Sequence, residues 1–180
     1  MSDILIGGPE KREILIVDYH PLWPDQFQHH AALIAQALGS KALRIEHVGS
    51  TSVPGLAAKP IIDLLVVVAD SSDEDAYLPA LVAAGYILRV REPHWHQHRM
   101  FRTPALDVHV HLFSAACPEI ARMLTFRDRL RTNASDRLRY ETLKRNLAKQ
   151  DWPDTNAYAQ AKSELVEQII SNALPPQANE

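Results

Sequence analysis

Cysteine is nearly absent from this chain, because Cys117 is the only one among 180 residues. A single thiol cannot form a disulfide within the chain, which excludes a disulfide-stapled fold and fits a reducing compartment. Cys117 directly precedes a predicted helix, where a small buried apolar residue is far more common than a catalytic nucleophile. We therefore assign it no chemical role.

Long apolar runs and an excess of positive charge are also missing. The longest apolar run, residues 61–69, is much too short to cross a bilayer and contains Asp63. The first residues lack a basic stretch followed by an apolar one, so no signal or transit peptide is expected. The net charge of -3 disfavours nucleic acid as a partner. We expect a cytoplasmic protein without a membrane partner, and the sequence carries no signal for a particular oligomeric state.

The chain has no internal repeat and no long linker, so residues 1–180 are expected to form one domain, with flexible ends at 1–12 and 175–180. Apolar alternation predicts strands at 13–19, 43–48, 61–69, 86–90, 100–103 and 105–113. Helical spacing predicts helices at 23–38, 76–84, 118–132, 136–150 and 156–172, with N-caps at Ser135 and at Asp154 or Thr155. Together these elements predict an α+β (α/β-like) fold, in which helices back a mixed β-sheet and the C-terminal part is helical.

The most informative stretch, residues 45–68, is predicted to be strand, glycine turn, short helical turn and strand. Gly49 allows the turn, and hydroxyls follow it at Ser50, Thr51 and Ser52. Hydroxyls and free backbone N–H groups at a helix start favour an anion such as phosphate. The alternative is a structural crossover in which the hydroxyls only cap the turn, and the pattern supports both interpretations about equally.

Asp63 interrupts the apolar strand that follows this turn. A carboxylate beside a bound anion requires a cation between them, and Mg²⁺ prefers carboxylate oxygens together with substrate phosphates. Lys59 supplies a further mobile positive charge. The first interpretation therefore predicts a magnesium-dependent phosphate site, whereas in the structural alternative Asp63 only caps a neighbouring turn.

A second set of titratable side chains lies in the strand predicted at 105–113. Residues two apart share a face, so Asp107, His109 and His111 line one side, while Val108, Val110 and Leu112 face the core. Such a strand could line a cleft or form a polar, solvent-facing side.

Histidines also alternate in the segment 94–98. His94 and His96 are expected on a mobile surface loop, whereas His98 begins a strand and Arg99 offers a planar fork for an anion. Imidazoles bind zinc, nickel or copper, so a transition-metal site formed by His98, His109 and His111 is the third of three hypotheses, after the two given below. Of Glu46 and His47, only one can face a ligand, and the sequence does not decide which.

The chain resembles the GrpB family, which has a nucleotidyltransferase-like fold and no established reaction. The resemblance is carried by residues 46–56 and 59–63, and by Trp23-Pro24, His98–Phe101, His109–His111, Phe126–Asp128 and Ala161-Lys162. It covers nearly the whole chain and implies that the strand of His109 lies beside that of Asp63. The wider nucleotidyltransferase pattern has a second carboxylate at position 65, where this chain has Leu65.

The resemblance implies a nucleotidyltransferase acting with Mg²⁺ on a nucleotide or another phosphorylated small molecule. The expected catalytic residues are Asp63, Asp107, His109 and His111, with Asp63 and Asp107 binding the metal. The expected phosphate-binding residues are Gly49, Ser50, Thr51, Ser52, Lys59, His98, Arg99, Arg127 and Lys162. Because Leu65 replaces a carboxylate, a non-catalytic phosphate-binding module is the alternative.

Overall fold

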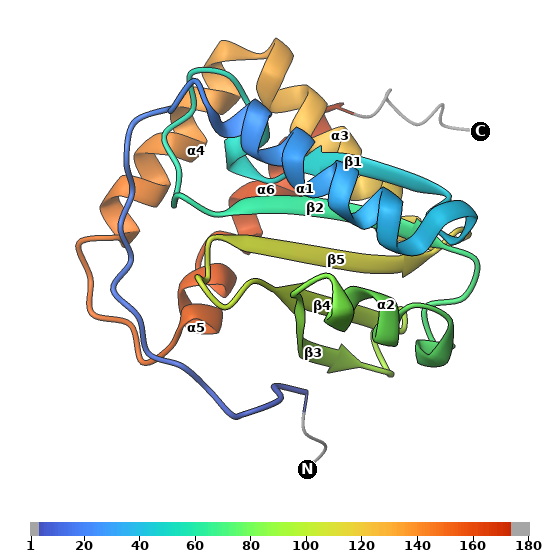
Figure 1. Cartoon of the computed structure of the whole chain (residues 1–180). Coiled ribbons are helices and arrows are strands. Elements are labelled where there is room, and N and C mark those ends of the chain that lie inside the picture. Colours follow the sequence, from blue (N-terminus) through green and yellow to red (C-terminus); the bar gives the residue numbers. More distant parts are fainter. Residues whose placement is uncertain (1–3, 174–180) are drawn as a thin grey trace.

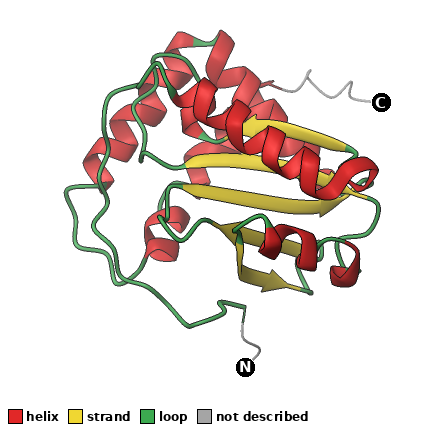
Figure 2. Cartoon of the chain, in the orientation of Figure 1, coloured by secondary structure: helices red, strands yellow, loops and turns green. Residues whose placement is uncertain are grey.

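A computed structural model describes residues 4–173. Within these residues five strands form one mixed sheet (Figures 1 and 2). From edge to edge they are β1 (Arg44–Val48), β2 (Ile62–Val68), β5 (Val108–Ser114), β4 (His98–Arg102) and β3 (Ile87–Glu92). The central pair, β2 and β5, is parallel, and all other neighbours are antiparallel. The predicted mixed sheet with helices is confirmed.

Helices cover both faces of this sheet (Figure 1). One face carries α1 (Trp23–Leu38) and α2 (Leu78–Ala83). The opposite side carries α3 (Pro118–Thr132), α4 (Ala134–Leu147), α5 (Thr155–Gln160) and α6 (Ser163–Ala173). Short 3₁₀ turns lie at Gly39–Lys41, Ser50–Ser52 and Glu74–Ala76. Among the described residues, no helix combines the length and apolar character that a membrane span requires.

The burial of β2 explains its nearly continuous apolar sequence. Leu64 and Val66 pack in the core beneath α1 and α2, whereas Leu65 and Val67 pack with Ile120 of α3. A strand covered on both faces is apolar throughout rather than alternating. By the same alternation, Asp63 lies on the side of α3, and its polarity marks where the helical cover is incomplete.

Two predicted elements differ from the structure. The segment 13–19 forms no strand, because only Val17 pairs, in a single bridge to Ala58. The helix predicted at 156–172 is two helices, α5 and α6, which are separated at Ala161 and Lys162.

The helix caps differ in part from those predicted. Asn133, and not Ser135, caps α4 by accepting a hydrogen bond from the backbone N–H of Asp136. The predicted cap at Asp154 is confirmed, since its carboxylate accepts from the N–H groups of Asn156 and Ala157.

Residues 4–12 were expected to be flexible but are bonded to the sheet edge. Leu5 forms a bridge with Val90 of β3, and Glu10 forms an ion pair with Arg102 at 2.9 Å. Residues 175–180, also predicted to be flexible, lie outside the described residues.

Candidate functional site

A cavity of about 250 Å³ lies beside the first residues of β2 and β5, on the side of α3 and α4. Its walls combine the Gly49–Thr51 turn with side chains from both strands and from three C-terminal elements. Its polar side chains are Ser50, Thr51, Lys59, Asp63, His109, His111, Tyr140, Lys144, Tyr158 and Lys162. A neighbouring cavity of about 420 Å³ shares Lys59, Asp63, His109, His111 and Lys162, and extends toward residues 5–14. Of the predicted strand face, His109 and His111 line this cleft and Asp107 does not.

Gly49 sets how closely the turn approaches Asp63. Its φ is +68°, a conformation that side chains rarely adopt, and a Cβ placed there would lie 2.4 Å from Asp63 Oδ2. Antiparallel pairing of Val48 with Asp63 brings the two together. Only glycine allows the turn to lie directly against this carboxylate.

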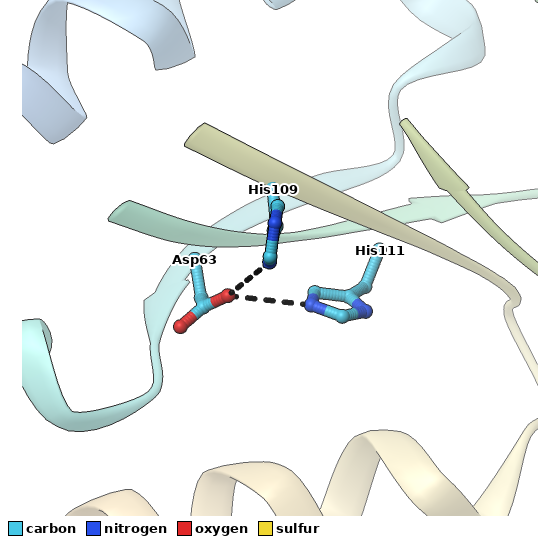
Figure 3. A group of neighbouring side chains, drawn as sticks. All are labelled: Asp63, His109 and His111. Atoms are coloured by element: carbon cyan, nitrogen blue, oxygen red, sulfur yellow. Dashed lines mark hydrogen bonds and ion pairs between the residues drawn. The ribbon is translucent and has the colours of Figure 1, made fainter. Parts of the chain in front are cut away.

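The carboxylate of Asp63 faces two histidines on the adjacent parallel strand (Figure 3). Register pairs Asp63 with His109, so both histidines of the alternating strand project to the same side as Asp63. Asp63 Oδ1 lies 3.5 Å from His109 Nδ1 and 3.4 Å from His111 Nε2. Burial raises the pKa of Asp63, but the two imidazoles lower it by more, so the carboxyl group stays ionised.

His111 is held from behind by a hydrogen-bonded chain. His98 Nε2 lies 3.1 Å from His111 Nδ1, and His98 Nδ1 lies 2.6 Å from Glu92 Oε2. The His98 ring stacks on His111 and on Phe113. Burial lowers the pKa of His98, which favours its neutral ring. His98 was expected to bind phosphate, but the structure places it behind His111 and not in the cavity wall.

Three lysines from separate parts of the chain line the same cavity. Lys144 of α4 donates a hydrogen bond to Ser50 Oγ at 2.9 Å and another to the carbonyl of Ala57. The pKa of Lys144 is lowered to about 7, chiefly by burial and also by the charge of Lys162. Burial likewise lowers the pKa of Lys59 and that of Lys162, each to about 8.

Each of these ammonium groups lies close to the ring of a tyrosine. Lys59 Nζ and Lys162 Nζ lie 5.2 and 4.5 Å from the centre of the Tyr158 ring, and Lys144 Nζ lies 4.9 Å from that of Tyr140. Within residues 4–173, no carboxylate lies within 4.0 Å of Lys59, Lys144 or Lys162. The cavity therefore gathers positive charge that the described part of the chain does not neutralise by direct pairing.

The three hydroxyls of the turn have different surroundings. Ser50 lines the cavity and accepts from Lys144. Thr51 also lines it, but its buried hydroxyl contacts His47 Nε2 at 3.0 Å and the Ile61 carbonyl at 3.3 Å. Ser52 donates to the Gly49 carbonyl at 2.6 Å and lies outside this cavity. The prediction of Ser52 as a phosphate ligand is corrected, because its hydroxyl stabilises the turn.

Asp107 does not join Asp63. The strand β5 begins only at Val108, and Asp107 lies in the preceding turn, where its carboxylate accepts a hydrogen bond from Thr103 Oγ1 at 2.6 Å. It borders a different cavity, together with Trp23 and His30. Its predicted metal-binding and catalytic roles are not supported, because strand alternation does not extend through the turn.

Arg99 and Arg127 also lie away from the cavity. Arg99 is on the face of β4 that carries Phe101, and its Nε pairs with Glu74 at 2.6 Å. Arg127 of α3 pairs through Nη1 with Glu46 at 2.7 Å and donates to the His47 carbonyl at 3.1 Å. Both arginines, predicted to bind phosphate, are buried in protein ion pairs that connect secondary-structure elements.

The structure places neither Glu46 nor His47 at the cavity. Glu46 lies on the side of α3, where it pairs with Arg127, whereas His47 stacks on Phe27 of α1 with ring centres 4.7 Å apart. Burial lowers the pKa of His47 to about 4. His47 is a core histidine, and neither residue lines the cavity.

Position 65 is closed to a ligand. Leu65 has no exposed surface and packs with Val48 and Ile120. Across the sheet its register partner is His111, so an imidazole stands on β5 beside the position where the wider pattern has its second carboxylate.

Sequence reasoning missed Lys144, Tyr140 and Tyr158. The helix pattern contained a signal for two of them, since Tyr140, Lys144 and Leu147 recur at spacings of four and three and form the buried face of α4. A lysine on an otherwise buried helical face is rare, and this rarity is the signal that could have singled out Lys144.

The architecture and the position of the turn beside Asp63 define a protein of the nucleotidyltransferase-like fold. A solved structure of the Cid1 poly(U) polymerase has this fold, with a TM-score of 0.53. The two chains are 15% identical, and the match covers 74% of this chain and 44% of the Cid1 chain. That similarity concerns the fold alone.

The chain belongs to the GrpB protein family, whose sequence profile matches residues 13–172. A UPF0157 protein from Halalkalibacterium halodurans is 52% identical over 175 residues, which cover 96% of this chain and 90% of that protein. The crystal structure of the conserved protein GrpB from Enterococcus faecalis is 35% identical with a TM-score of 0.79, and the match covers 88% of this chain and 96% of that one.

Proposed function

We propose that this GrpB-family chain binds a nucleotide or a related phosphorylated small molecule in the cavity at Asp63 and acts as a nucleotidyltransferase. In this reaction an acceptor hydroxyl would take the nucleotidyl group of a nucleoside triphosphate, and pyrophosphate would leave. The observation that carries the proposal is the convergence of Lys59, Lys144 and Lys162 beside the Gly49–Ser50 turn. The nucleotidyltransferase-like fold supports this reaction class, although a fold does not by itself determine chemistry.

The lysines favour an anion for an electrostatic reason. Burial disfavours the charged form of all three, and no described carboxylate pairs with them. A phosphate group in the cavity would supply that missing negative charge and accept their hydrogen bonds. Together, cavities of about 250 and 420 Å³ offer a volume in the range that small-molecule and cofactor sites occupy.

The polar side chains suggest distinct roles. Lys144, fixed by Ser50, would orient the phosphate, while Lys59 and Lys162 would neutralise charge that develops on its oxygens. A divalent cation fits Asp63, His109 and His111, whose donor atoms lie within 4.8 Å of one another. When bound, such a cation would polarise a phosphoryl oxygen and neutralise negative charge.

Leu65 favours a second candidate function, binding without transfer. Two-metal phosphoryl chemistry needs oxygen ligands for each ion, and the apolar packing of Leu65 removes one of them. In this case the cavity would retain the ligand without turnover.

Calorimetry with nucleoside triphosphates, followed by an assay for pyrophosphate release, tests both candidates. We expect the wild-type chain to bind nucleoside triphosphates. Lys144→Met should weaken this binding about tenfold or more, because a charge-assisted hydrogen bond worth about 1.5–3 kcal/mol is lost. Lys149→Met is the matched control, since Lys149 is exposed beyond the end of the same helix.

The outcomes separate the candidates. Binding with pyrophosphate release that Asp63→Asn abolishes supports transfer, and binding without release supports the non-catalytic module. No binding by the folded wild-type chain, or equal weakening by Lys144→Met and Lys149→Met, contradicts the proposed ligand class.

A further inference from the structure

We propose that Asp63, His109 and His111 form a site for one divalent transition-metal ion, of the Zn²⁺ or Co²⁺ class, which binds there in preference to Mg²⁺. A catalytic role for this ion rests on the proposed function, because the ion would lie beside the cavity that is proposed to bind phosphate. The metal affinity itself can be measured without any nucleotide.

The distances between the donor atoms fit a small metal ion. Asp63 Oδ1 lies 3.5 Å from His109 Nδ1 and 3.4 Å from His111 Nε2. Ligands placed 2.0–2.2 Å from an ion at tetrahedral angles lie roughly 3.3–3.5 Å from each other. Two of the three separations therefore already match the edges of a tetrahedral site.

The contacts behind His111 orient its ring toward Asp63. Glu92 carries a carboxylate, which only accepts, so His98 Nδ1 donates to it. His98 Nε2 lies 3.1 Å from His111 Nδ1 and holds that nitrogen. The other ring nitrogen, His111 Nε2, is therefore directed at the carboxylate of Asp63.

A metal ion placed between His111 Nε2 and Asp63 Oδ1, which lie 3.4 Å apart, would use both atoms as ligands. A ligating histidine also commonly donates its other ring N–H to a fixed partner, which orients the ring. His98, 6% exposed and stacked on His111, is such a partner, so we describe it as a positioning residue and not as a ligand.

The type of donor atom decides between metal classes. Mg²⁺ prefers an octahedral shell of oxygens, whereas imidazole nitrogens suit zinc and its neighbours in the first transition row. Here two of three ligands are imidazoles, and buried Leu65 removes the next carboxylate that β2 might have offered. A fourth position directed toward the cavity would admit water or a phosphate oxygen.

Titration calorimetry with Zn²⁺, and absorption spectroscopy with Co²⁺, test this site in full-length protein that lacks a histidine tag and has been treated with a chelator. We expect one equivalent of Zn²⁺ per chain and the visible bands of four- or five-coordinate Co²⁺. We expect Asp63→Asn and His111→Gln to lower the Zn²⁺ affinity at least 100-fold, and His98→Gln to lower it 10- to 100-fold. His94→Gln is the matched control, since His94 is exposed in the loop before β4, and it should bind like wild type.

Several results would overturn the inference. Zn²⁺ binding that persists in folded Asp63→Asn and is lost in His94→Gln would place the ion in the surface loop. Equal affinity for Mg²⁺ and Zn²⁺ would refute the preference for a transition metal. Absence of metal binding, with an NMR signal showing His111 as an imidazolium, would show that a proton occupies the gap. None of these results would alter nucleotide binding through Lys144, which is measured separately in metal-free protein.

Discussion

At the scale of single residues, Gly49 determines whether the turn and Asp63 can occupy adjacent space. Gly49→Ala would place a methyl group 2.4 Å from Asp63 Oδ2, in a backbone with φ +68°. We expect a loss of about 3 kcal/mol in the free energy of unfolding, since backbone strain and a steric clash add. Urea denaturation followed by circular dichroism measures this loss.

Gly55→Ala separates the two contributions. Gly55 has a similar φ of +78°, but no atom lies within 4 Å of the position of its missing Cβ. We expect it to cost only about 1 kcal/mol, the penalty of the left-handed conformation. Equal losses for the two variants would show that the contact with Asp63 has no energetic effect.

Single-residue predictions from the sequence succeeded where an apolar neighbour fixed the face of a strand. Val108, Val110 and Leu112 lie in the core, so the histidines between them point to the opposite side, as alternation predicted. The alternation of side chains along a strand also places Arg99. Phe101, two residues on, is fully buried beneath α1 and α2, which places Arg99 on the face away from Asp63.

At the scale of elements, the pair of Arg127 and Glu46 attaches α3 to β1. Arg127→Met would leave a half-buried Glu46 with only its more exposed partner Arg44. We expect a loss of about 2 kcal/mol in unfolding free energy, somewhat below the cost of breaking a fully buried pair. Nucleotide and zinc affinities should not change, because Arg127 does not line the cavity.

Arg122→Met is the control on the same helix. Its ion pairs with Glu119 and Glu167 are more exposed, so its removal should cost less than about 1 kcal/mol. Urea denaturation and calorimetry on both variants give the comparison. A tenfold loss of nucleotide affinity in folded Arg127→Met would instead support the ligand role that the sequence predicted.

The prediction of whole elements was accurate where local signals were strong. The structure begins α3 at Pro118 and ends it at Thr132, as helical spacing indicated. The division between α5 and α6 has no such signal, because neither glycine nor proline occurs near Ala161. There the packing of Lys162 on Tyr158, a tertiary contact, accompanies the break.

At the scale of the whole molecule, the cavity depends on packing between parts of the chain that are distant in sequence. Lys59 precedes β2, Lys144 belongs to α4, and Lys162 lies between α5 and α6. Only the folded arrangement brings these lysines together. The local pattern indicated Lys59 and the family resemblance indicated Lys162, whereas Lys144 was assigned no role. Their shared burial couples stability to pH.

The sign of this coupling follows from the lowered pKa values. The pKa of Lys144 is about 7 in the folded chain, against an ordinary value of 10.5. Between these values the unfolded chain binds a proton that the folded chain lacks, so the free energy of unfolding should rise with pH. One group contributes at most about 1.4 kcal/mol per pH unit, and Lys59 and Lys162 should add to the rise above about pH 8.

Binding of a phosphate anion should oppose the rise of the unfolding free energy with pH, because the complex favours protonated lysines. We expect pyrophosphate to stabilise the protein most at or below pH 7 and progressively less toward pH 10. Urea denaturation at pH 6.5, 8 and 9.5, with and without pyrophosphate, measures both effects. In Lys144→Met the rise with pH should be smaller and the stabilisation by pyrophosphate weaker, whereas exposed Lys149→Met should follow wild type. If the unfolding free energies of wild type and Lys144→Met change with pH in parallel, Lys144 keeps its ordinary pKa in the folded chain. The cavity would then lack the unneutralised buried charge that favours an anion.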